Sequence, residues 1–325
     1  MQDPDTPRVS DALRPRLAVS SCLLGQAVRY DGGHKRHNWL VDTLGRCVDF
    51  VPHCPEVSIG LGIPREPIQL TGDPDHPRAR AVYHPDRDMT NQLQADARAV
   101  AARLDRVAGY VFKSRSPSCG LYHVAVHAES GEVVHNGRGI YASAIQETRP
   151  WLPIEEESRL DDVDLRENFV CRLFTYQRWL SLCAEGLSAQ RLLNFHARHK
   201  YLLMAHSPAA CRRLGQLLSG LRDVDLPALS ERYCAGLMKA MAHGAGSSGH
   251  VNVLQHIMGY LKRRIGPSDK DELHRAIEAY RLNQVPLAAP VVCLRRHLRS
   301  CRDEYIGKQW YLWPYPDELG LRDLL

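Results

Sequence analysis

Short apolar runs alternate with amphipathic segments in the first half of the chain. Residues 16–21, 48–53 and 109–112 are short, apolar and partly β-branched or aromatic, which predicts buried strands. Residues 89–107 carry apolar side chains at helical spacing, with arginine and aspartate on the other face. Strands that alternate with helices favour a parallel sheet, so we expect an α/β, Rossmann-like domain with a mostly parallel sheet.

Smaller elements complete the expected α/β domain. Residues 34–45 and 140–147 predict short helices. Residues 123–127 and 132–135 flank a Glu-Ser-Gly turn, which predicts a hairpin.

The second half of the chain is patterned almost wholly as helix, which predicts an all-α helical domain. The acidic run at residues 155–157 and two nearby prolines mark the change of character, and we place the boundary near residues 165–187. The expected domains therefore span residues 14–165 and 187–320. The periodicity predicts helices over residues 165–184, 188–204, 209–218, 227–242, 250–264, 270–281 and 290–302.

Composition narrows the class of protein. The chain has 325 residues, which is enough for two domains with real cores, and the first residues lack the basic and apolar regions of a signal peptide. No apolar run is long enough to span a bilayer, so we expect a cytoplasmic protein with no membrane partner. The net charge of +5 permits an anionic partner without requiring one, and no protein partner is implied.

Three of the ten cysteines stand directly after the predicted strands or their loops. Cys22, Cys54 and Cys119 form no local Cys-x-x-Cys pattern, but ligands of α/β sheets bind beyond the carboxyl ends of the strands. Thiols stay reduced in the cytosol, so metal binding, catalysis or burial must explain the cysteines. Three converging thiolates suit either zinc or an iron–sulfur cluster, with one position left open for substrate.

Polar residues near these cysteines are candidates for chemistry. Glu56 follows Cys54 closely and suits a general acid or base, although a cap or a salt bridge would also explain it. Ser116 offers a hydroxyl to the same space, although serine before cysteine is also common turn chemistry. For Arg29 and Asp31 the residues alone favour a role in tying down their loop over substrate binding. The candidate substrate-binding residues are Arg29, Asp31, Lys113, Ser114 and Ser118.

Cations in the helical half suggest contacts to phosphate. His196 and Lys200 share one face of a predicted helix. Because no acidic residue lies within this stretch, the sequence argues against a zinc-protease site. Aromatic residues near the end of the chain suit base stacking or a packed tail equally well. The candidate nucleic-acid contacts are His196, His199, Lys200, Lys262, Arg263 and Arg264.

Three motifs of the first half carry a resemblance to a known family. Residues 21–32, 54–67 and 113–120 closely resemble, in order, the motifs of the thiouracil desulfurase family. In that family three cysteines bind a [4Fe–4S] cluster whose fourth iron is free, and a glutamate and a serine act in proton transfer. The resemblance implies that Cys22, Cys54 and Cys119 hold the cluster, with Glu56 and Ser116 as the catalytic pair.

The second half resembles a helical domain of unknown function that is often fused to this family. Fused proteins of this sort resemble bacterial tRNA 4-thiouridine desulfidases, which implies thiolated tRNA as partner, with uridine and sulfide as products. The Gly-rich segment at residues 244–249 departs from the more basic segment expected there. Three alternatives stay open: action on free thiouracil or thionucleosides, a non-enzymatic iron–sulfur protein that binds RNA or senses redox state, and a zinc site.

Overall fold

The chain folds into two compact units. The computed structural model describes residues 14–220, 225–261, 264–301 and 303–325. Contacts within the chain divide it between Asp161 and Asp162. Most of the segment where the boundary was expected, residues 165–187, is the helix α4 (Val163–Ala184), which belongs to the C-terminal unit.

A parallel sheet forms the centre of the N-terminal unit. Its strands are β1 (Arg16–Ser20), β2 (Asp49–His53), β5 (Gly109–Phe112) and β8 (Ile154–Glu156), in the order β2-β1-β5-β8. All three pairings are parallel, which confirms the predicted class of sheet. Every residue of β5 is buried, as expected for an inner strand that is covered on both faces.

The strand β8 is absent from the sequence-based prediction. Two of its three residues are glutamates, and this composition hides it from a search for apolar runs. Glu155 and Glu156 are nevertheless buried, because their carboxylates have partners within the unit. Glu155 and Glu156 are therefore part of the sheet, and Glu157 follows it directly. The boundary between the two units lies beyond all three residues.

A second, mixed sheet lies in the same unit. It orders β3 (Ile68–Thr71), β4 (Arg78–Ala81), β6 (Val124–His127) and β7 (Val133–Gly137) as β4-β3-β6-β7. The antiparallel pair β6–β7 is the predicted hairpin. The strands β3 and β4 were not predicted, because runs of four residues that include glutamine and arginine give little periodic signal.

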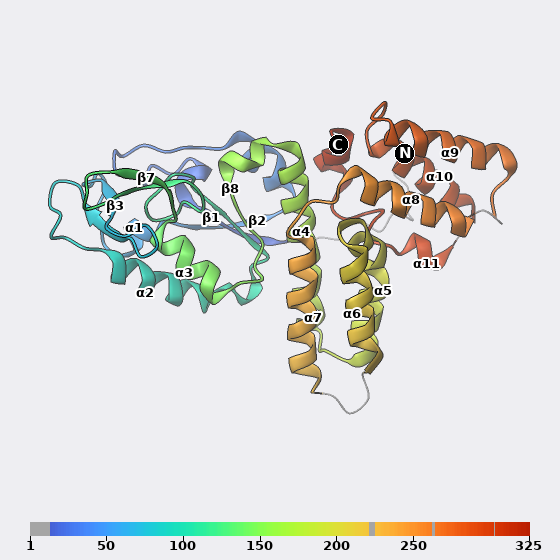
Figure 1. Cartoon of the computed structure of the whole chain (residues 1–325), viewed down its shortest axis with the longest axis horizontal. Coiled ribbons are helices and arrows are strands. Elements are labelled where there is room, and N and C mark those ends of the chain that lie inside the picture. The colour runs from blue at the N-terminus through green and yellow to red at the C-terminus, as the bar shows by residue number, and fades with distance from the viewer. Residues whose placement is uncertain (1–13, 221–224, 262–263, 302) are drawn as a thin grey trace. The chain divides into compact units, whose positions relative to one another are not determined.

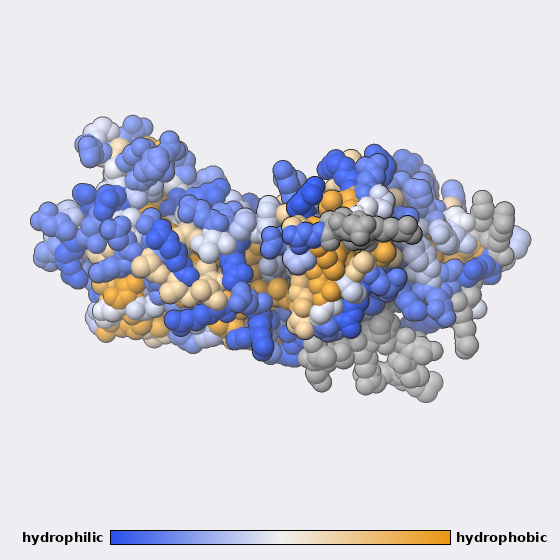
Figure 2. All heavy atoms as spheres, turned by 90° about the horizontal axis from the view of Figure 1, so that it is seen from below, coloured by the Kyte–Doolittle hydropathy of each residue, from blue (hydrophilic) through white to orange (hydrophobic). Residues whose placement is uncertain are grey.

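Helices of the N-terminal unit are short. α2 (Thr90–Ala101) and α3 (Ile140–Thr148) lie side by side, as Figure 1 shows. Residues 34–45 do not form the expected α-helix; a wide π-helical turn spans Trp39–Thr43, and a 3₁₀ turn follows at Leu44–Arg46. The face of this unit seen in Figure 2 is largely hydrophilic, with apolar patches between.

The C-terminal unit is helical, as predicted, and no helix among the described residues has the length and apolar composition to cross a bilayer. Within it, α5, α6 and α7 pack together, as do α8, α9 and α10 (Figure 1). Each predicted helix has a counterpart within a few residues of its expected ends. The main helices are α4, α5 (Ala189–His206), α6 (Pro208–Leu217), α7 (Leu226–Met241), α8 (Ser247–Leu261), α9 (Pro267–Arg281), α10 (Ala288–Cys301) and the short α11 (Glu304–Gly307).

The core of the C-terminal unit contains ionisable side chains. His250 is 4% exposed, and its Nδ1 lies 3.2 Å from the hydroxyl oxygen of Tyr311. Burial, with help from the charge of Arg322, lowers the pKa of His250 to about 3. The folded state therefore favours the neutral imidazole.

This buried histidine predicts acid sensitivity. A folded pKa below the unfolded value of about 6.5 gives stability that is complete above pH ~6.5 and is lost as the pH falls toward the folded pKa. We expect His250→Gln to flatten the fall in unfolding free energy between pH 6.5 and 4 by up to ~1.4 kcal/mol per pH unit. Urea unfolding followed by helical circular dichroism measures this slope.

The matched control is His274→Gln, which replaces an exposed histidine of α9 and should keep the wild-type slope. An unchanged slope in His250→Gln would contradict the account of the buried imidazole.

Candidate active site

The carboxyl ends of the parallel strands meet at one edge of the sheet. Ser20 at the end of β1 lies opposite His53 at the end of β2, and Phe112 at the end of β5 lies opposite Glu156. A cavity of about 300 Å³ opens at this edge. Residues that line it from these segments include Cys22, Cys54, Glu56, Lys113, Ser114, Ser116 and Cys119.

Each cysteine is positioned by a different local structure. Cys22 lies in a 3₁₀ turn, Ser21–Leu24, directly after β1. Cys54 caps the four-residue helix α1 (Pro55–Ser58) after β2. Cys119 lies in the loop after β5, where the Ser116 hydroxyl oxygen accepts hydrogen bonds from the backbone amides of Ser118 (3.2 Å) and Cys119 (3.1 Å).

The first turn of α3 holds the Cys119 loop in place. The amide of Ile140 donates to the carbonyl of Pro117 at 3.0 Å, and that of Ala142 donates to the carbonyl of Ser118 at 3.1 Å. Gly139 passes so close to the loop that a Cβ there would lie 2.5 Å from the carbonyl oxygen of Ser118. The loop and the helix are therefore fitted together through backbone contacts.

Burial raises the pKa of all three thiols. It raises the pKa of Cys22 to about 11, with a further rise from Cys54 and a partial offset from Lys113 and Arg29. Burial also raises the pKa of Cys54, and it raises that of Cys119 well above its usual value. Buried thiols of this kind are poor free nucleophiles. They become thiolates when a bound cation replaces the lost hydration, so the site favours ligands over a cysteine nucleophile.

Glu56 is held from both sides of its carboxylate. Arg65 donates to Oε2 from Nε at 2.8 Å and approaches it with Nη2 at 2.7 Å, and the Ser118 hydroxyl donates to Oε1 at 2.9 Å. Glu56 thus makes the salt bridge that was the structural alternative, and it also lines the cavity. The fully buried Ser118 donates its hydroxyl hydrogen bond to the Glu56 carboxylate, whereas the Ser116 oxygen accepts from backbone amides.

Lys113 and Ser114 are organised by Glu157, which follows β8. The Lys113 ammonium forms a short ion pair with Glu157 Oε1. The backbone amide of Ser114 donates to Oε2 at 2.6 Å, and its hydroxyl donates to Oε1 at 2.8 Å. The sequence analysis did not select Glu157 or Arg65 as site residues. Arg65 lies within the motif at residues 54–67 but was not singled out there, and only the sheet register brings Glu157 to this edge.

Arg29 and Asp31 occupy different environments. Arg29 lines the cavity, and its buried Nε has no hydrogen-bond partner within the described ranges. Asp31 Oδ1 accepts a hydrogen bond from the amide of Gly33 at 3.0 Å and lies 3.5 Å from Arg29 Nε. Asp31 is not among the residues that line the cavity, so its contacts support the role in the loop, while Arg29 remains available to a ligand.

The separation of the sulfur atoms bears on the kind of metal group. Among the described residues, the group of three ligand atoms found mutually within 4.8 Å is Glu272, Cys293 and His297, and the three cavity cysteines form no such group. A tetrahedral zinc with bonds of ~2.3 Å would bring thiolate sulfurs to ~3.8 Å from one another. At least two of the three cavity sulfurs therefore lie more than 4.8 Å apart, and three thiols that line one cavity suit either zinc or an iron–sulfur cluster.

The candidate nucleic-acid contacts of the C-terminal unit lie in different structural environments. His196 and Lys200 line a surface groove of about 590 Å³ together with Arg212. His199 is 1% exposed and stacks on Phe195 with ring centroids 3.9 Å apart. Because a buried ring cannot reach a phosphate, we correct the expectation for His199.

The basic run at residues 262–264 is described only in part. Lys262 and Arg263 lie outside the described residues. Arg264 is exposed, and its guanidinium pairs with Asp303 at 2.7 Å. This ion pair within the unit neutralises part of the charge that a phosphate would meet.

The fit between Gly139 and the Cys119 loop predicts a sensitive position. Gly139→Ala forces a Cβ onto the backbone of Ser118, and such overpacking costs about 1–3 kcal/mol. We expect a lower free energy of unfolding of the N-terminal unit and faster alkylation of Cys119 in metal-free protein. Gly62→Ala is the control, since its Cβ would meet nothing closer than 3.8 Å. Wild-type alkylation kinetics in Gly139→Ala would refute the proposed fit.

Comparisons with known proteins agree with the two-unit architecture. Residues 17–157 match the family model described as 2-thiouracil desulfurase, and residues 200–316 match a model described as a protein of unknown function, DUF1722. A solved structure of the [4Fe-4S]-dependent thiouracil desulfidase TudS is 28% identical in sequence, covers 46% of this chain and 94% of that chain, and has a TM-score of 0.37.

Two curated relatives are similar to parts of the chain. The uncharacterized protein YbgA of Escherichia coli (strain K12) is 28% identical over 165 residues, which are 50% of this chain and 95% of that protein. The uncharacterized protein YbbK of Bacillus subtilis (strain 168) is 28% identical over 156 residues, which are 45% of this chain and 99% of that protein. The chain therefore joins a domain of the 2-thiouracil desulfurase family to a DUF1722 domain.

Proposed function

We propose that this protein is a non-redox desulfidase that removes the sulfur atom of 4-thiouridine in tRNA and leaves uridine and sulfide. The observation that carries the proposal is the meeting of three cysteines and Glu56 at one cavity, within a domain of the 2-thiouracil desulfurase family. The reaction exchanges a thiocarbonyl and water for a carbonyl and hydrogen sulfide, so no electron donor is needed.

The cavity suits a [4Fe–4S] cluster held by Cys22, Cys54 and Cys119. The three cysteines line one cavity, and the positive charges of Lys113 and Arg29 offset part of the rise in the pKa of Cys22 that burial causes. When bound, the cluster would supply an open iron as a Lewis acid for the sulfur of the substrate.

Glu56 is the candidate base for the attacking water. Its Oε1 and Oε2 already accept from Ser118 and Arg65, which fixes the plane of the carboxylate and leaves lone pairs for a water molecule. The carboxylate thereby takes a proton from water at a defined position. General base catalysis of this kind contributes about 10²- to 10⁴-fold to the rate.

Ser116 is the candidate proton relay. Its oxygen accepts two backbone amides, so its own hydrogen remains to be donated into the cavity. A hydroxyl fixed in this way can pass a proton to a ring nitrogen or to the departing group. Lys113 and Ser114 are held by Glu157 and form a fixed polar wall beside it.

Surface charge in the C-terminal unit supports a polynucleotide substrate. The cavity volume of about 300 Å³ is at the lower end for small-molecule sites, and the proposed cluster would occupy part of it. A tRNA base would have to leave its stack, at a cost of a few kcal/mol. Phosphate contacts by Lys200 and Arg212 in the C-terminal groove would offset that cost and would make binding depend on salt.

The second candidate is desulfuration of free thiouracil or thionucleosides, because the cavity volume does not distinguish a free base from a base of tRNA. In that case the C-terminal unit has no part in substrate recognition. A non-enzymatic protein that binds RNA or senses redox state is the remaining alternative, and it would leave every thiolated substrate unchanged.

One experiment separates these functions. Protein purified without oxygen is analysed for iron and sulfide and then incubated with thiolated tRNA, free 4-thiouridine or thiouracil, while the near-ultraviolet thiocarbonyl absorbance is followed. We expect loss of the band with intact tRNA chains, abolished by Cys119→Ala and kept by Cys183→Ala, which replaces an exposed cysteine of α4.

Further arms of the experiment assign the substrate. Lys200→Ala combined with Arg212→Ala should raise KM for tRNA and leave turnover of free thiobase unchanged. Equal turnover of tRNA and free base, unaffected by these changes, would favour the small-molecule substrate. Inactivity of iron-loaded protein on all three substrates would favour the sensor.

Glu56→Gln tests the base. The amide keeps the volume and can still accept from Ser118, but it cannot take a proton from water. We expect kcat to fall by at least about 100-fold while iron content stays at the wild-type level.

The matched control for this change is Glu132→Gln, an exposed position of the N-terminal unit, which should leave kcat unchanged. Wild-type turnover in Glu56→Gln would remove this residue from the mechanism.

A further inference from the structure

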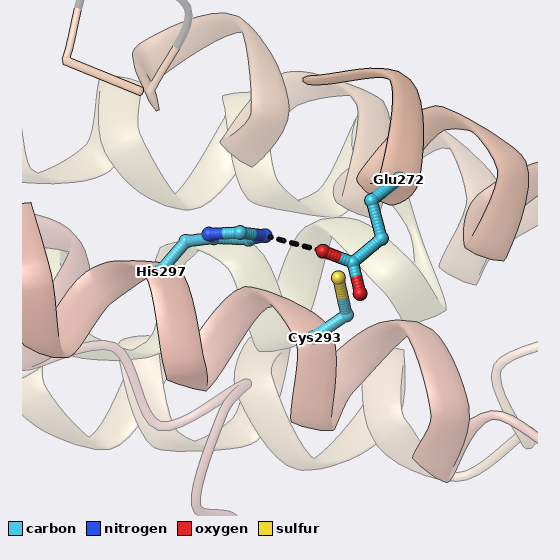
Figure 3. A group of neighbouring side chains, drawn as sticks. All are labelled: Glu272, Cys293 and His297. Carbon is cyan, nitrogen blue, oxygen red and sulfur yellow. Dashed lines mark ion pairs between the residues drawn. The ribbon is translucent and has the colours of Figure 1, made fainter. Parts of the chain in front are cut away.

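A second cluster of ligand-type side chains lies in the C-terminal unit, between α9 and α10. Cys293 and His297 stand one turn apart on α10, and Glu272 projects toward them from α9, as Figure 3 shows. Their ligand atoms all lie within 4.8 Å of one another. Three different donor types therefore meet at one point, from two packed helices.

One nitrogen of the His297 imidazole is unsatisfied. The residue is 6% exposed, and its buried Nε2 makes no hydrogen bond to any residue that the structure describes. This nitrogen points toward Glu272, whose Oε2 lies 3.6 Å away, beyond hydrogen-bonding range (Figure 3). A buried polar atom that is left unpaired costs free energy, and a ligand bound between these side chains would remove that cost.

Arg296 competes for the same carboxylate. Its guanidinium forms a short ion pair with Glu272 and lies 4.0 Å from the Cys293 sulfur. The Arg296 side chain is 58% exposed, so it can turn into solvent, and exposed ion pairs contribute only about 0–1 kcal/mol. A divalent cation offers the carboxylate twice the charge and also binds the thiolate and the imidazole.

We propose that Glu272, Cys293 and His297 form a Zn²⁺ site that joins α9 to α10, separate from the three-cysteine cavity. Thiolate, imidazole and carboxylate together are donors that zinc accepts in tetrahedral sites. Such a site places ligand atoms roughly 3.3–3.8 Å apart, so the side chains need to close by only about 1 Å. Three protein ligands leave the fourth position for water.

The test uses full-length protein in which Cys22, Cys54 and Cys119 are replaced by serine. This background removes the other thiol site, so the outcome does not depend on the proposed desulfidase activity. We expect one Co²⁺ per chain, with a thiolate-to-cobalt band in the near ultraviolet and visible bands of tetrahedral cobalt, displaced by Zn²⁺. Thermal unfolding should shift upward with added Zn²⁺.

Single substitutions in that background identify the ligands. Cys293→Ser should abolish the near-ultraviolet band, and His297→Gln should weaken Co²⁺ binding at least about 10-fold. Cys234→Ser, which replaces a buried cysteine of α7, should keep both the near-ultraviolet band and the affinity for Co²⁺. Arg296→Ala should tighten binding roughly 2- to 5-fold by removing the competing ion pair.

Wild-type protein gives a second measurement should the serine background fail to fold. Elemental analysis of iron-loaded protein should find one zinc per chain, and Cys293→Ser should remove the zinc without changing the iron. Absence of stoichiometric binding in folded protein, or binding that survives Cys293→Ser, would overturn the proposal.

Discussion

The parallel register of β1, β2, β5 and β8 is the constraint on which the site depends. It sets Ser20 beside His53 and Phe112 beside Glu156, so four segments that are far apart in sequence end at one edge. A slip of one residue would turn the buried side chains of these strands to the opposite face. The geometry of the thiols is therefore secured by the same apolar packing that stabilises the sheet.

The acids of the site differ from its thiols in how their charge is compensated. Glu56 pairs with Arg65, and the buried Glu157 pairs with Lys113, so each carboxylate has a fixed cationic partner. Burying a charge is costly unless it is paired, and these pairs hold the loops on either side of the cavity. The thiols of Cys22, Cys54 and Cys119 have no comparable compensation, since the net effect of their surroundings raises each pKa. The three thiols therefore lack the positive charge that would stabilise them as thiolates, and a bound metal cation would supply it.

Sequence reasoning recovered what periodicity and order along the chain encode. The helices from α4 to α10 were predicted because their apolar positions repeat regularly, and the cysteines because each follows a strand. The strand β8 and Glu157 were missed, since nothing local distinguishes buried glutamates from exposed ones. His199 was misplaced because α5 is packed by α6, α7 and α8, and a helix covered on several sides has no single polar face.

The two thiol-containing clusters differ most in the spacing of their donors. Glu272, Cys293 and His297 lie within 4.8 Å of one another, whereas the cavity cysteines form no group that tight. Donor type differs as well, because three thiolates suit zinc or an iron–sulfur cluster, whereas a thiolate, an imidazole and a carboxylate together suit a single zinc ion. A single ion draws its ligands to within about 4 Å, so the group between α9 and α10 would need only a small closure to hold one.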